Sequence, residues 1–315
     1  MQIIDFTKEW LPQAQALAQQ NYEEARTACP DLPNTPLPPI DFFAENGFGV
    51  AAVDGDKLLG FLGGYPPFTP VYCTPDVTGT WSPLHAHAVQ KENRENIWQR
   101  LYQAAAEKWV QAGSASHSIT LYTHDTDAVT TLFHYGFGAR CADLIRPMTD
   151  IPCAEVPHIH FKELTADENT KLHPLRLALI DHLAKSPAFM VETKEMAHGF
   201  LQRREENPPR MFAALDGDDI IAYYELEDEA ENFVTTTPGM WNICGAHCLP
   251  EYRGQGIAQA LLAFMVRTLR EEGATLLGVD CETFNPTAIH FWKKYFTQYT
   301  TSVVRRIDEY ALLLK

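Results

Sequence analysis

The sequence has little positive charge and no long apolar run. Its 315 residues include 25 Lys and Arg against 41 Asp and Glu, which gives a formal net charge of −16 at pH 7. An acidic surface repels the phosphates of nucleic acids, so we expect no nucleic-acid partner. No apolar stretch reaches the roughly 18 residues that a membrane-spanning helix needs, and the opening stretch MQIIDFTKEW has neither a basic region nor an apolar signal core. These absences predict a cytoplasmic protein that does not bind a membrane.

A regular cysteine pattern is also absent. The seven cysteines are an odd number, and none of them forms a Cys-x-x-Cys pair or a Cys/His ligand pattern. Disulfide frameworks and zinc sites are recognised in sequences by such patterns. We therefore expect free or buried thiols and no metal site.

The sequence contains an internal repeat with a spacing of 160 residues. Matching positions carry the same residue without any gap, which chance rarely produces over so long a window. The matched pairs include Trp81 and Trp241, His87 and His247, Ile97 and Ile257, Gly113 and Gly273, and Tyr135 and Tyr295. We interpret residues 1–148 as a first domain and residues 159–315 as a second. Residues 149–158 contain two prolines and no periodicity, as expected of a linker.

Both copies show the same succession of expected elements. Each begins with a short strand and an amphipathic helical region, followed by a hairpin whose turn is Asp-Gly-Asp. Two further strands, a long helix that stops at Gly113 or Gly273, a fifth strand and a second helix complete each copy. This alternation predicts an α/β (α+β) fold with two tandem domains. Each domain is expected to hold a mixed, mostly antiparallel central sheet flanked by helices.

The stretch PEYRGQGIAQALL, residues 250–262, joins an expected strand to the long helix of the second copy. A helix N-terminus exposes unpaired backbone N–H groups and a partial positive charge, which favour phosphate. Gly254, Gly256 and Ala258 are small enough to let an anion approach that backbone, and Arg253 adds a full positive charge. The pattern predicts a pyrophosphate site, with a glycine-rich turn that binds no ligand as the alternative.

Two segments of the second copy resemble motifs of the GCN5-related N-acetyltransferase superfamily. In the acyl-CoA-binding motif of that family, Arg/Gln-x-x-Gly-x-Gly/Ala follows the fourth strand and wraps the pyrophosphate of CoA. Arg253, Gly256 and Ala258 occupy these positions. The segment NPTAIHFWKKYF resembles a second motif, Asn-x-x-Ala, with Asn285 and Ala288 at the matching places.

The resemblance covers residues 159–315 and extends in weaker form over residues 1–148. It implies a tandem acetyltransferase-like chain that uses acetyl-CoA (coenzyme A) as its cosubstrate. The implied contacts to CoA come from the end of one strand, the following loop and helix start, and the second motif. These residues are Cys248, Leu249, Arg253, Gly254, Gln255, Gly256, Ile257, Ala258, Asn285, Ala288 and Trp292.

The first copy departs from the motif. The residues at the positions of Arg253, Gly254, Gly256 and Ala258 are Asn93, Arg94, Asn96 and Trp98. We expect the Trp98 indole to crowd the space that a pyrophosphate needs, so that this copy keeps the fold and has lost the cofactor. Asp125 replaces Asn285 in the second motif, and we expect it to cap a helix rather than to meet a ligand.

The resemblance implies transfer of an acetyl group from the CoA sulfur to an amine. Such a reaction needs a neutral amine, hydrogen bonds to the carbonyl oxygen and a proton for the departing thiolate. Members of the family hold the thioester carbonyl with a backbone N–H of the splayed fourth strand. The candidate donors are therefore the N–H groups of His247, Cys248 and Leu249.

Three residues are candidates for the base. Asp280 lies on the fifth strand, shortly before Asn285, where some family members carry a glutamate. Glu225 in the third strand is another carboxylate that could face the cleft, and His247 has the side chain that titrates closest to neutral pH. A chain of water molecules is a further alternative.

The general acid differs from the family pattern. Members commonly place a tyrosine four residues after the motif alanine, where this sequence has Trp292, and an indole N–H does not usefully protonate a thiolate. Tyr223, Tyr224 and Tyr295 are the remaining candidates, although Tyr295 also recurs in the first copy and is expected to serve packing. Otherwise the thiolate leaves into solvent without assistance.

We therefore expect an N-acetyltransferase that transfers an acetyl group from acetyl-CoA to a primary amine of a small molecule. The second copy is expected to carry both cofactor and chemistry, in a monomer or homodimer. Two alternatives remain: a non-catalytic acyl-CoA-binding sensor, and an enzyme that acetylates a protein N-terminus or lysine.

Overall fold

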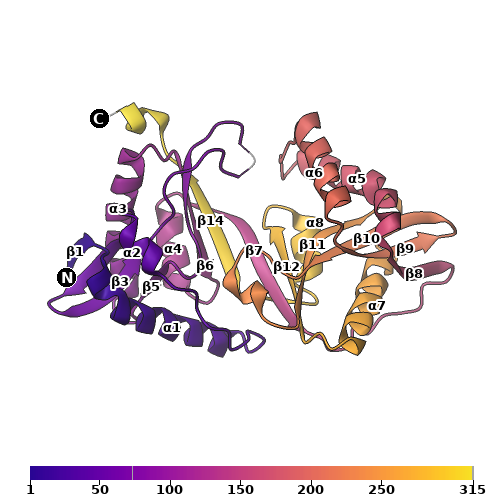
Figure 1. Ribbon diagram of the computed structural model, residues 1–315, viewed down its shortest axis with the longest axis horizontal. Coiled ribbons are helices and arrows are strands. Elements are labelled where there is room, and N and C mark those ends of the chain that lie inside the picture. The colour runs from indigo at the N-terminus through magenta and orange to yellow at the C-terminus, as the bar shows by residue number, and fades with distance from the viewer. Residues whose placement is uncertain (73, 314–315) are drawn as a thin grey trace. The chain divides into compact units, whose positions relative to one another are not determined.

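The computed structural model describes residues 1–72 and 74–313, which form two compact units (Figure 1). The first unit comprises Met1–Asp143, Asn232–Val234 and Gln298–Lys315, and the second comprises Leu144–Glu231 and Thr235–Thr297. The repeat predicts residues 298–315 in the second domain, whereas they belong to the first unit because their strand pairs there.

The first unit contains two sheets. One has the strand order β1-β2-β3-β5, and the other has the order β4-β6-β14-β7, to which β7 contributes its residues up to Asp143. The strands are β1 (Gln2–Asp5), β2 (Val50–Asp54), β3 (Lys57–Leu62), β4 (Gly79–Ser82), β5 (His87–Val89), β6 (Ser116–Tyr122), β7 (Gly138–Pro147) and β14 (Thr300–Arg306). The helices are α1 (Leu11–Ala28), α2 (Asp41–Glu45), α3 (Arg94–Gln111) and α4 (Thr126–His134).

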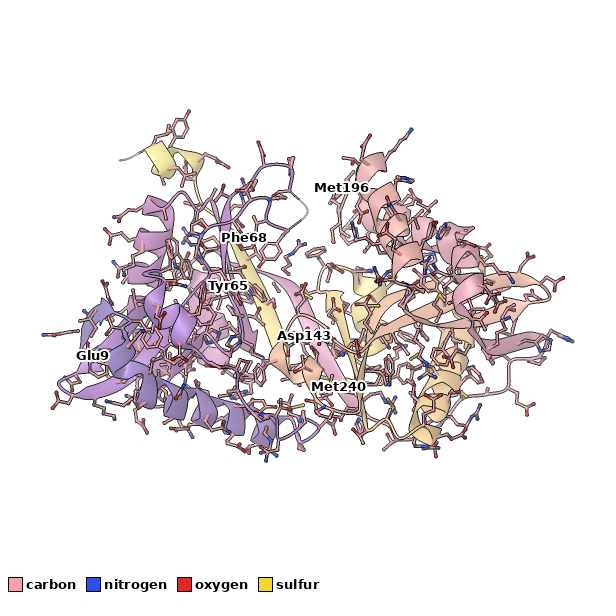
Figure 2. All side chains as sticks on the ribbon, in the orientation of Figure 1. Glu9, Tyr65, Phe68, Asp143, Met196 and Met240 are labelled. Atoms are coloured by element: carbon pink, nitrogen blue, oxygen red, sulfur yellow. The ribbon has the colours of Figure 1, made fainter. Side chains whose placement is uncertain are left out.

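The core of the first unit forms on the apolar face of α3. Ile97, Leu101 and Ala105 recur every four residues, so they lie on one side of the helix and are buried against strands β2 and β3. A second group of aromatic side chains surrounds Tyr65, whose ring lies 5.7 Å from that of Trp81 and 5.4 Å from that of Phe43 (Figure 2).

Strand β14 comes from the C-terminal end of the chain. It pairs antiparallel with β6 along its whole length, from Thr300 opposite Tyr122 to Arg306 opposite Ser116. Val303 is buried in the same core cluster as the α3 residues. The first unit therefore needs a strand that follows every element of the second unit in the sequence.

The second unit has one sheet with the strand order β12-β11-β10-β9-β8. Helices α5 and α6 lie on one face of this sheet and α7 on the other (Figure 1). The strands are β8 (Ile159–Leu164), β9 (Arg210–Asp216), β10 (Asp219–Glu227), β11 (Met240–Cys248) and β12 (Leu276–Glu282). The helices are α5 (His173–Ala184), α6 (Lys194–Glu206), α7 (Ile257–Glu271) and α8 (Pro286–Trp292).

Both units also contain shorter elements. These are β13 (Thr297–Gln298), η1 (Lys8–Trp10), η2 (Ala166–Leu172), η3 (Phe233–Thr236), η4 (Pro250–Tyr252) and η5 (Glu309–Leu313).

The predicted fold class is confirmed. In the second unit β10 pairs antiparallel with β9 and β11, and β11 pairs in parallel with β12. The predicted Asp-Gly-Asp hairpin joins β9 to β10, with Gly217 at φ 60°. Gly273 follows α7 at φ 96°, and the next N–H, of Ala274, donates to the Leu269 carbonyl at 3.0 Å, which closes the helix end as expected of glycine.

The described cysteines agree with the expectation of free thiols. Cys29, Cys153, Cys244 and Cys248 are free thiols, whereas Cys73 lies outside the described residues. Within residues 1–72 and 74–313, no helix combines the length and the apolar character needed to cross a membrane.

Candidate functional site

Strands β11 and β12 separate part of the way along their length. They pair only from Met240 opposite Leu276 to Ile243 opposite Val279, while β11 continues to Cys248 and β12 to Glu282. Beyond Ile243, β11 stays paired with β10 alone. The two strands therefore leave an opening in the sheet on the side where α7 begins.

A cavity of about 490 Å³ lies at this opening. Its walls come from α5, β10, the end of β11, the loop after it, the first turn of α7, and α8. Most of the residues predicted to contact CoA line it, namely Cys248, Arg253, Gly254, Gly256, Ile257, Ala258, Asn285, Ala288 and Trp292. The predicted contacts Leu249 and Gln255 are not among its lining residues. Residues that the sequence could group only by motif therefore meet at one site.

The loop before α7 presents bare backbone to this cavity. Gly254 and Gly256 have φ values of 77° and 81°, a conformation that residues with a side chain rarely adopt. The first intrahelical bond of α7 runs from the Ala260 N–H to the Gly256 carbonyl, and no side chain caps the helix. The amides of the first turn therefore lack intrahelical acceptors and are free to bind an anion.

The Arg253 side chain lies next to these amides. Its Nε donates to the Cys248 carbonyl at 2.9 Å, which ties the loop to the end of β11. The residue is exposed and lines the cavity, so its guanidinium remains accessible to a charged ligand. Together with the α7 amides it forms a positive cradle in a chain that is strongly acidic overall.

The geometry of β11 decides which of the three candidate N–H groups could bind the thioester carbonyl. The Leu249 N–H donates to the Ile221 carbonyl at 2.9 Å, so it is not available to a ligand. Hydrogen bonding alternates along an antiparallel pair, which turns the His247 N–H toward β10 as well. The N–H of Cys248, and that of Ala246, point instead to the opening. The sequence analysis missed Ala246 because the register of β11 on β10 decides its direction.

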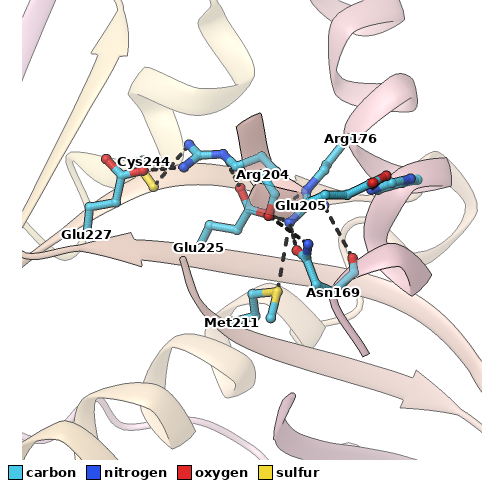
Figure 3. Close-up of polar contacts among 9 residues, drawn as sticks. Asn169, Arg176, Arg204, Glu205, Met211, Glu225, Glu227 and Cys244 are labelled. Carbon is cyan, nitrogen blue, oxygen red and sulfur yellow. Dashed lines mark hydrogen bonds and ion pairs between the residues drawn. The ribbon is translucent and has the colours of Figure 1, made fainter. Parts of the chain in front are cut away.

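Glu225, a candidate base, is buried in an ion cluster on the α5 and α6 face of the sheet (Figure 3). Its Oε1 accepts from Arg176 Nε at 2.7 Å, and its Oε2 lies 3.6 Å from Arg204 Nε. Arg176 is fully buried and also donates to Asn169 Oδ1 at 2.6 Å. Glu225 is not among the residues that line the cavity, so the carboxylate serves to hold two arginines.

Asp280 and His247, the other candidate bases, have different surroundings. Asp280 is exposed on β12, as strand alternation predicts, but it does not line the cavity. His247 lines the cavity and is buried; this burial, aided by Arg253 and His182, lowers the pKa of His247 to about 4. Its imidazole is therefore neutral at pH 7 and a weak base.

A residue that the sequence did not single out, His182 of α5, also lines the cavity. Its Nε2 lies 3.3 Å from the Thr287 hydroxyl of α8, and its ring lies 6.2 Å from that of His247. Leu179, one helical turn earlier, faces the same cavity. Helical spacing could have paired these two residues, but nothing in the sequence places α5 beside α8.

The tyrosine candidates for the acid also separate. Tyr223 is buried in a core cluster with Leu172 and Leu175, away from the cavity lining. The Tyr224 hydroxyl donates to the Ala258 carbonyl at 2.9 Å, and burial holds its pKa well above the usual value. Tyr295 lines the cavity and is half-buried, which raises its pKa. Tyr224 also lines the cavity, but its hydroxyl is engaged with Ala258, so Tyr295 is the candidate tyrosine best placed to reach a ligand.

The corresponding region of the first unit is built differently. Because Ile97 is the repeat partner of Ile257, α3 begins one turn earlier than α7, with Asn93 as its N-cap at φ 55°. The Trp98 indole is buried in the core, with its ring 5.1 Å from that of His87, the repeat partner of the cavity-lining His247. That Trp98 excludes a pyrophosphate from the first unit stays a prediction.

Arg94, the repeat partner of Gly254, is the first residue of α3. It is buried, donates to Glu24 Oε2 at 2.7 Å and to the Val89 carbonyl at 2.9 Å, and lies 3.5 Å from Asp125. Arg94, Glu24 and Asp125 line a smaller pocket of about 330 Å³. The Asp125 carboxylate accepts from the Ala128 N–H at 3.1 Å, which confirms its predicted role as a helix cap.

Comparison with protein families gives a match within the second unit. Residues 177–296 match the model of the Acetyltransferase (GNAT) family. No curated protein sequence matches the chain.

Solved structures add a likeness in fold over more of the chain. A GCN5-related N-acetyltransferase from Sphaerobacter thermophilus aligns with a TM-score of 0.53 at 14% identity, over 82% of this chain and 80% of that one. A GCN5-related glucosamine N-acetyltransferase region of a fungal multi-domain GH3 β-N-acetylglucosaminidase aligns with a TM-score of 0.55 at 13% identity. That alignment covers 96% of this chain and 38% of the fungal one. Family match and fold together identify residues 177–296 as a domain of the GNAT acetyltransferase family.

Proposed function

We propose that the second unit binds acetyl-CoA and transfers its acetyl group to a primary amine of a small molecule. The observation that carries the proposal is the exposed, positive cradle at the start of α7, which opens into the cavity where β11 and β12 separate. A diphosphate fits such a cradle because the free backbone amides can donate hydrogen bonds to it. The partial positive charge of the helix N-terminus also stabilises an anion. The opening between β11 and β12 would let an extended thioester pass from the start of α7 toward the face of the sheet that α5 covers.

The residues of this chain would perform three tasks. The amides of the first turn of α7 and Arg253 would hold the pyrophosphate, and the Cys248 or Ala246 N–H would stabilise the carbonyl oxygen as it gains negative charge. The amine nitrogen would attack the carbonyl carbon while the bond from carbon to sulfur breaks. Tyr295, which lines the cavity, would give a proton to the departing thiolate.

We propose further that the first unit binds no CoA. Its helix α3 starts with Arg94, whose guanidinium is paired with Glu24 and close to Asp125. A pyrophosphate would have to displace Arg94 and then approach two carboxylates. Calorimetric titration with CoA should therefore give one binding site per chain.

Two glycine variants test the cradle. In Gly256→Ala and Gly217→Ala a side chain is added at positive φ, and neither Cβ would meet an atom within 4 Å. Both variants should lose about 1–2 kcal/mol of stability from the same backbone strain. Only Gly256→Ala should also weaken CoA binding, by about tenfold, because its strain falls on the anion-binding turn. Equal CoA affinity in the two variants would contradict the proposed site.

Thiol release from acetyl-CoA tests the reaction. The full chain should release free CoA thiol in the presence of one member of a panel of small amines, and glucosamine belongs in that panel because the fungal structure is named for it. CoA binding without thiol release would favour a non-catalytic acyl-CoA sensor. Trp292 supports this alternative, because it stands where family members commonly have a tyrosine. Release with peptides alone would favour acetylation of a protein N-terminus or lysine.

A further inference from the structure

The cavity contains no carboxylate among its described lining residues. The titratable nitrogen bases there are the imidazoles of His182, His247 and His290 and the amine of Lys294. His247 is buried and His290 is exposed on α8, whereas His182 is half-buried at the junction of α5 and α8. Lysine amines are ordinarily cations at pH 7, and tyrosine and cysteine side chains ordinarily keep their protons, so the imidazoles are the candidates for a base in this cavity.

We propose that His182 is the catalytic base that takes the proton of the acceptor amine, and that Thr287 and Asn285 determine which ring nitrogen takes it. This inference rests on the proposed acetyltransferase function. It adds His182 to the candidate bases, with Asn285, the N-cap of α8, and Thr287 of α8 as positioning residues.

Hydrogen bonding between α8 and α5 fixes the tautomer of His182. The Asn285 Oδ1 can only accept, and it does so from the Thr287 hydroxyl at 2.8 Å and from the Ala288 N–H at 3.4 Å. Because Thr287 has a single hydroxyl proton and gives it to Asn285, its oxygen must accept from His182 Nε2, 3.3 Å away. The neutral ring is then protonated at Nε2 and has its lone pair at Nδ1.

The step balances within the reactants and this side chain. The amine nitrogen forms a bond to the acetyl carbon, the bond from carbon to sulfur breaks, and its electron pair stays on sulfur. The proton lost by the nitrogen goes to His182 Nδ1, which makes the ring a cation. The thiolate leaves and takes a proton from Tyr295 or from solvent, and His182 returns its proton to solvent.

The surroundings of His182 favour this role over His247. Charged or titratable groups from four parts of the chain lie around His182. His247 comes from β11 and Arg253 from the loop before α7, while His290, Lys294 and Tyr295 belong to α8 or directly follow it. Asp181 and Lys185 are the neighbours of His182 in α5 and at its C-terminal end. Within the described part of the chain, His247 has no hydrogen-bond partner that would orient its ring, whereas Thr287 orients that of His182. Burial also leaves the His247 imidazole weakly basic, with a pKa of about 4.

The test uses the full chain with the amine that gives the fastest thiol release. His182→Gln keeps an amide donor near the Nε2 position and removes the base, so it should lower kcat by about 10²–10³. The acidic limb of the profile of kcat against pH should disappear, added imidazole should restore part of the rate, and CoA affinity should stay unchanged. His198→Gln, an exposed histidine on α6, is the matched control.

Thr287 variants test the positioning role separately. Thr287→Val keeps the shape and removes the hydroxyl, so it should lower kcat by about tenfold while the acidic limb of the pH profile remains, and Thr287→Ser should restore the rate. If His182→Gln keeps its rate within threefold, or if His247→Gln alone removes the acidic limb, the assignment is wrong while the acetyltransferase proposal stands. If the wild-type chain releases no thiol with any amine, the proposed function fails and the base assignment fails with it.

Discussion

At the scale of single residues, Glu225 carries a consequence for stability. Its carboxylate neutralises Arg176, which is fully buried, and approaches Arg204 (Figure 3). Glu225→Ala leaves a buried guanidinium without a counter-charge, so the free energy of unfolding should fall by about 3–5 kcal/mol. Denaturation by urea measures this change.

Glu227→Ala is the control for Glu225, because Glu227 pairs with the same Arg204 but is more than one-third exposed. This variant should cost at most about 1 kcal/mol. If Glu225→Ala keeps its unfolding midpoint and loses only activity, the carboxylate acts in the reaction and the structural role given to it here is wrong.

Single residues also show what the sequence could and could not predict. A local pattern contains Arg253, Gly254 and Gly256, and the backbone conformation that glycine permits fixes the loop that they form. The motif alone therefore predicted that these residues lie together at the binding site. Glu225 and His182 depend on contacts between elements far apart in the chain. An isolated sequence shows a carboxylate in a strand, but not the two arginines of α5 and α6 that surround it.

At the scale of elements, the parallel pairing of β11 and β12 depends on Gly278. A Cβ at this position would lie 2.5 Å from Asn242 Oδ1 and 2.6 Å from Met240 Cε. Gly278→Ala should therefore push the strands apart at the point that supports the cavity, with a loss of about 1–3 kcal/mol and weaker CoA binding.

A helical glycine provides the control. Gly199 lies in α6, where a Cβ would have its nearest neighbour, an Arg203 nitrogen, at 3.6 Å. Gly199→Ala should leave CoA affinity unchanged and raise stability by about 0.4–1 kcal/mol, because it restricts the unfolded chain. A Gly278→Ala variant as stable as the wild type would contradict the close packing of β11 and β12.

Elements of the two copies differ where the repeat alone predicts sameness. The fourth strand of the second unit is continuous in β11, whereas the first unit has β4 and β5 in two different sheets. The long helices also start one turn apart, because Asn93 adopts a left-handed conformation that glycine provides at 256. The repeat does not predict this shift, because asparagine adopts the left-handed conformation less readily than glycine.

At the scale of the whole molecule, buried histidines predict sensitivity to acid. Burial lowers the pKa of His87 and His247 to about 4 and that of His117 to about 3. The unfolded chain binds these protons near pH 6.5, so the stability that the neutral rings provide is complete above pH 6.5 and is lost as the pH falls toward 4. Each ring contributes roughly 3 kcal/mol to this loss.

Urea unfolding at pH 7, 5.5 and 4.5 measures the effect. The midpoint should fall with each step, and both units should respond because His87 and His117 lie in the first and His247 in the second. His117→Phe, which removes one of these groups and keeps an aromatic ring beside Tyr102 and Trp109, should flatten the dependence. An unfolding midpoint that does not change between pH 7 and 4.5 would show that these rings are protonated in the folded state.

The position of β14 has a consequence for biosynthesis. A ribosome makes β6 well before β14, so the first unit lacks the strand that pairs with β6 until residues 300–306 have emerged. The first unit must therefore wait, with one side of β6 unpaired, while the whole of the second unit is synthesised.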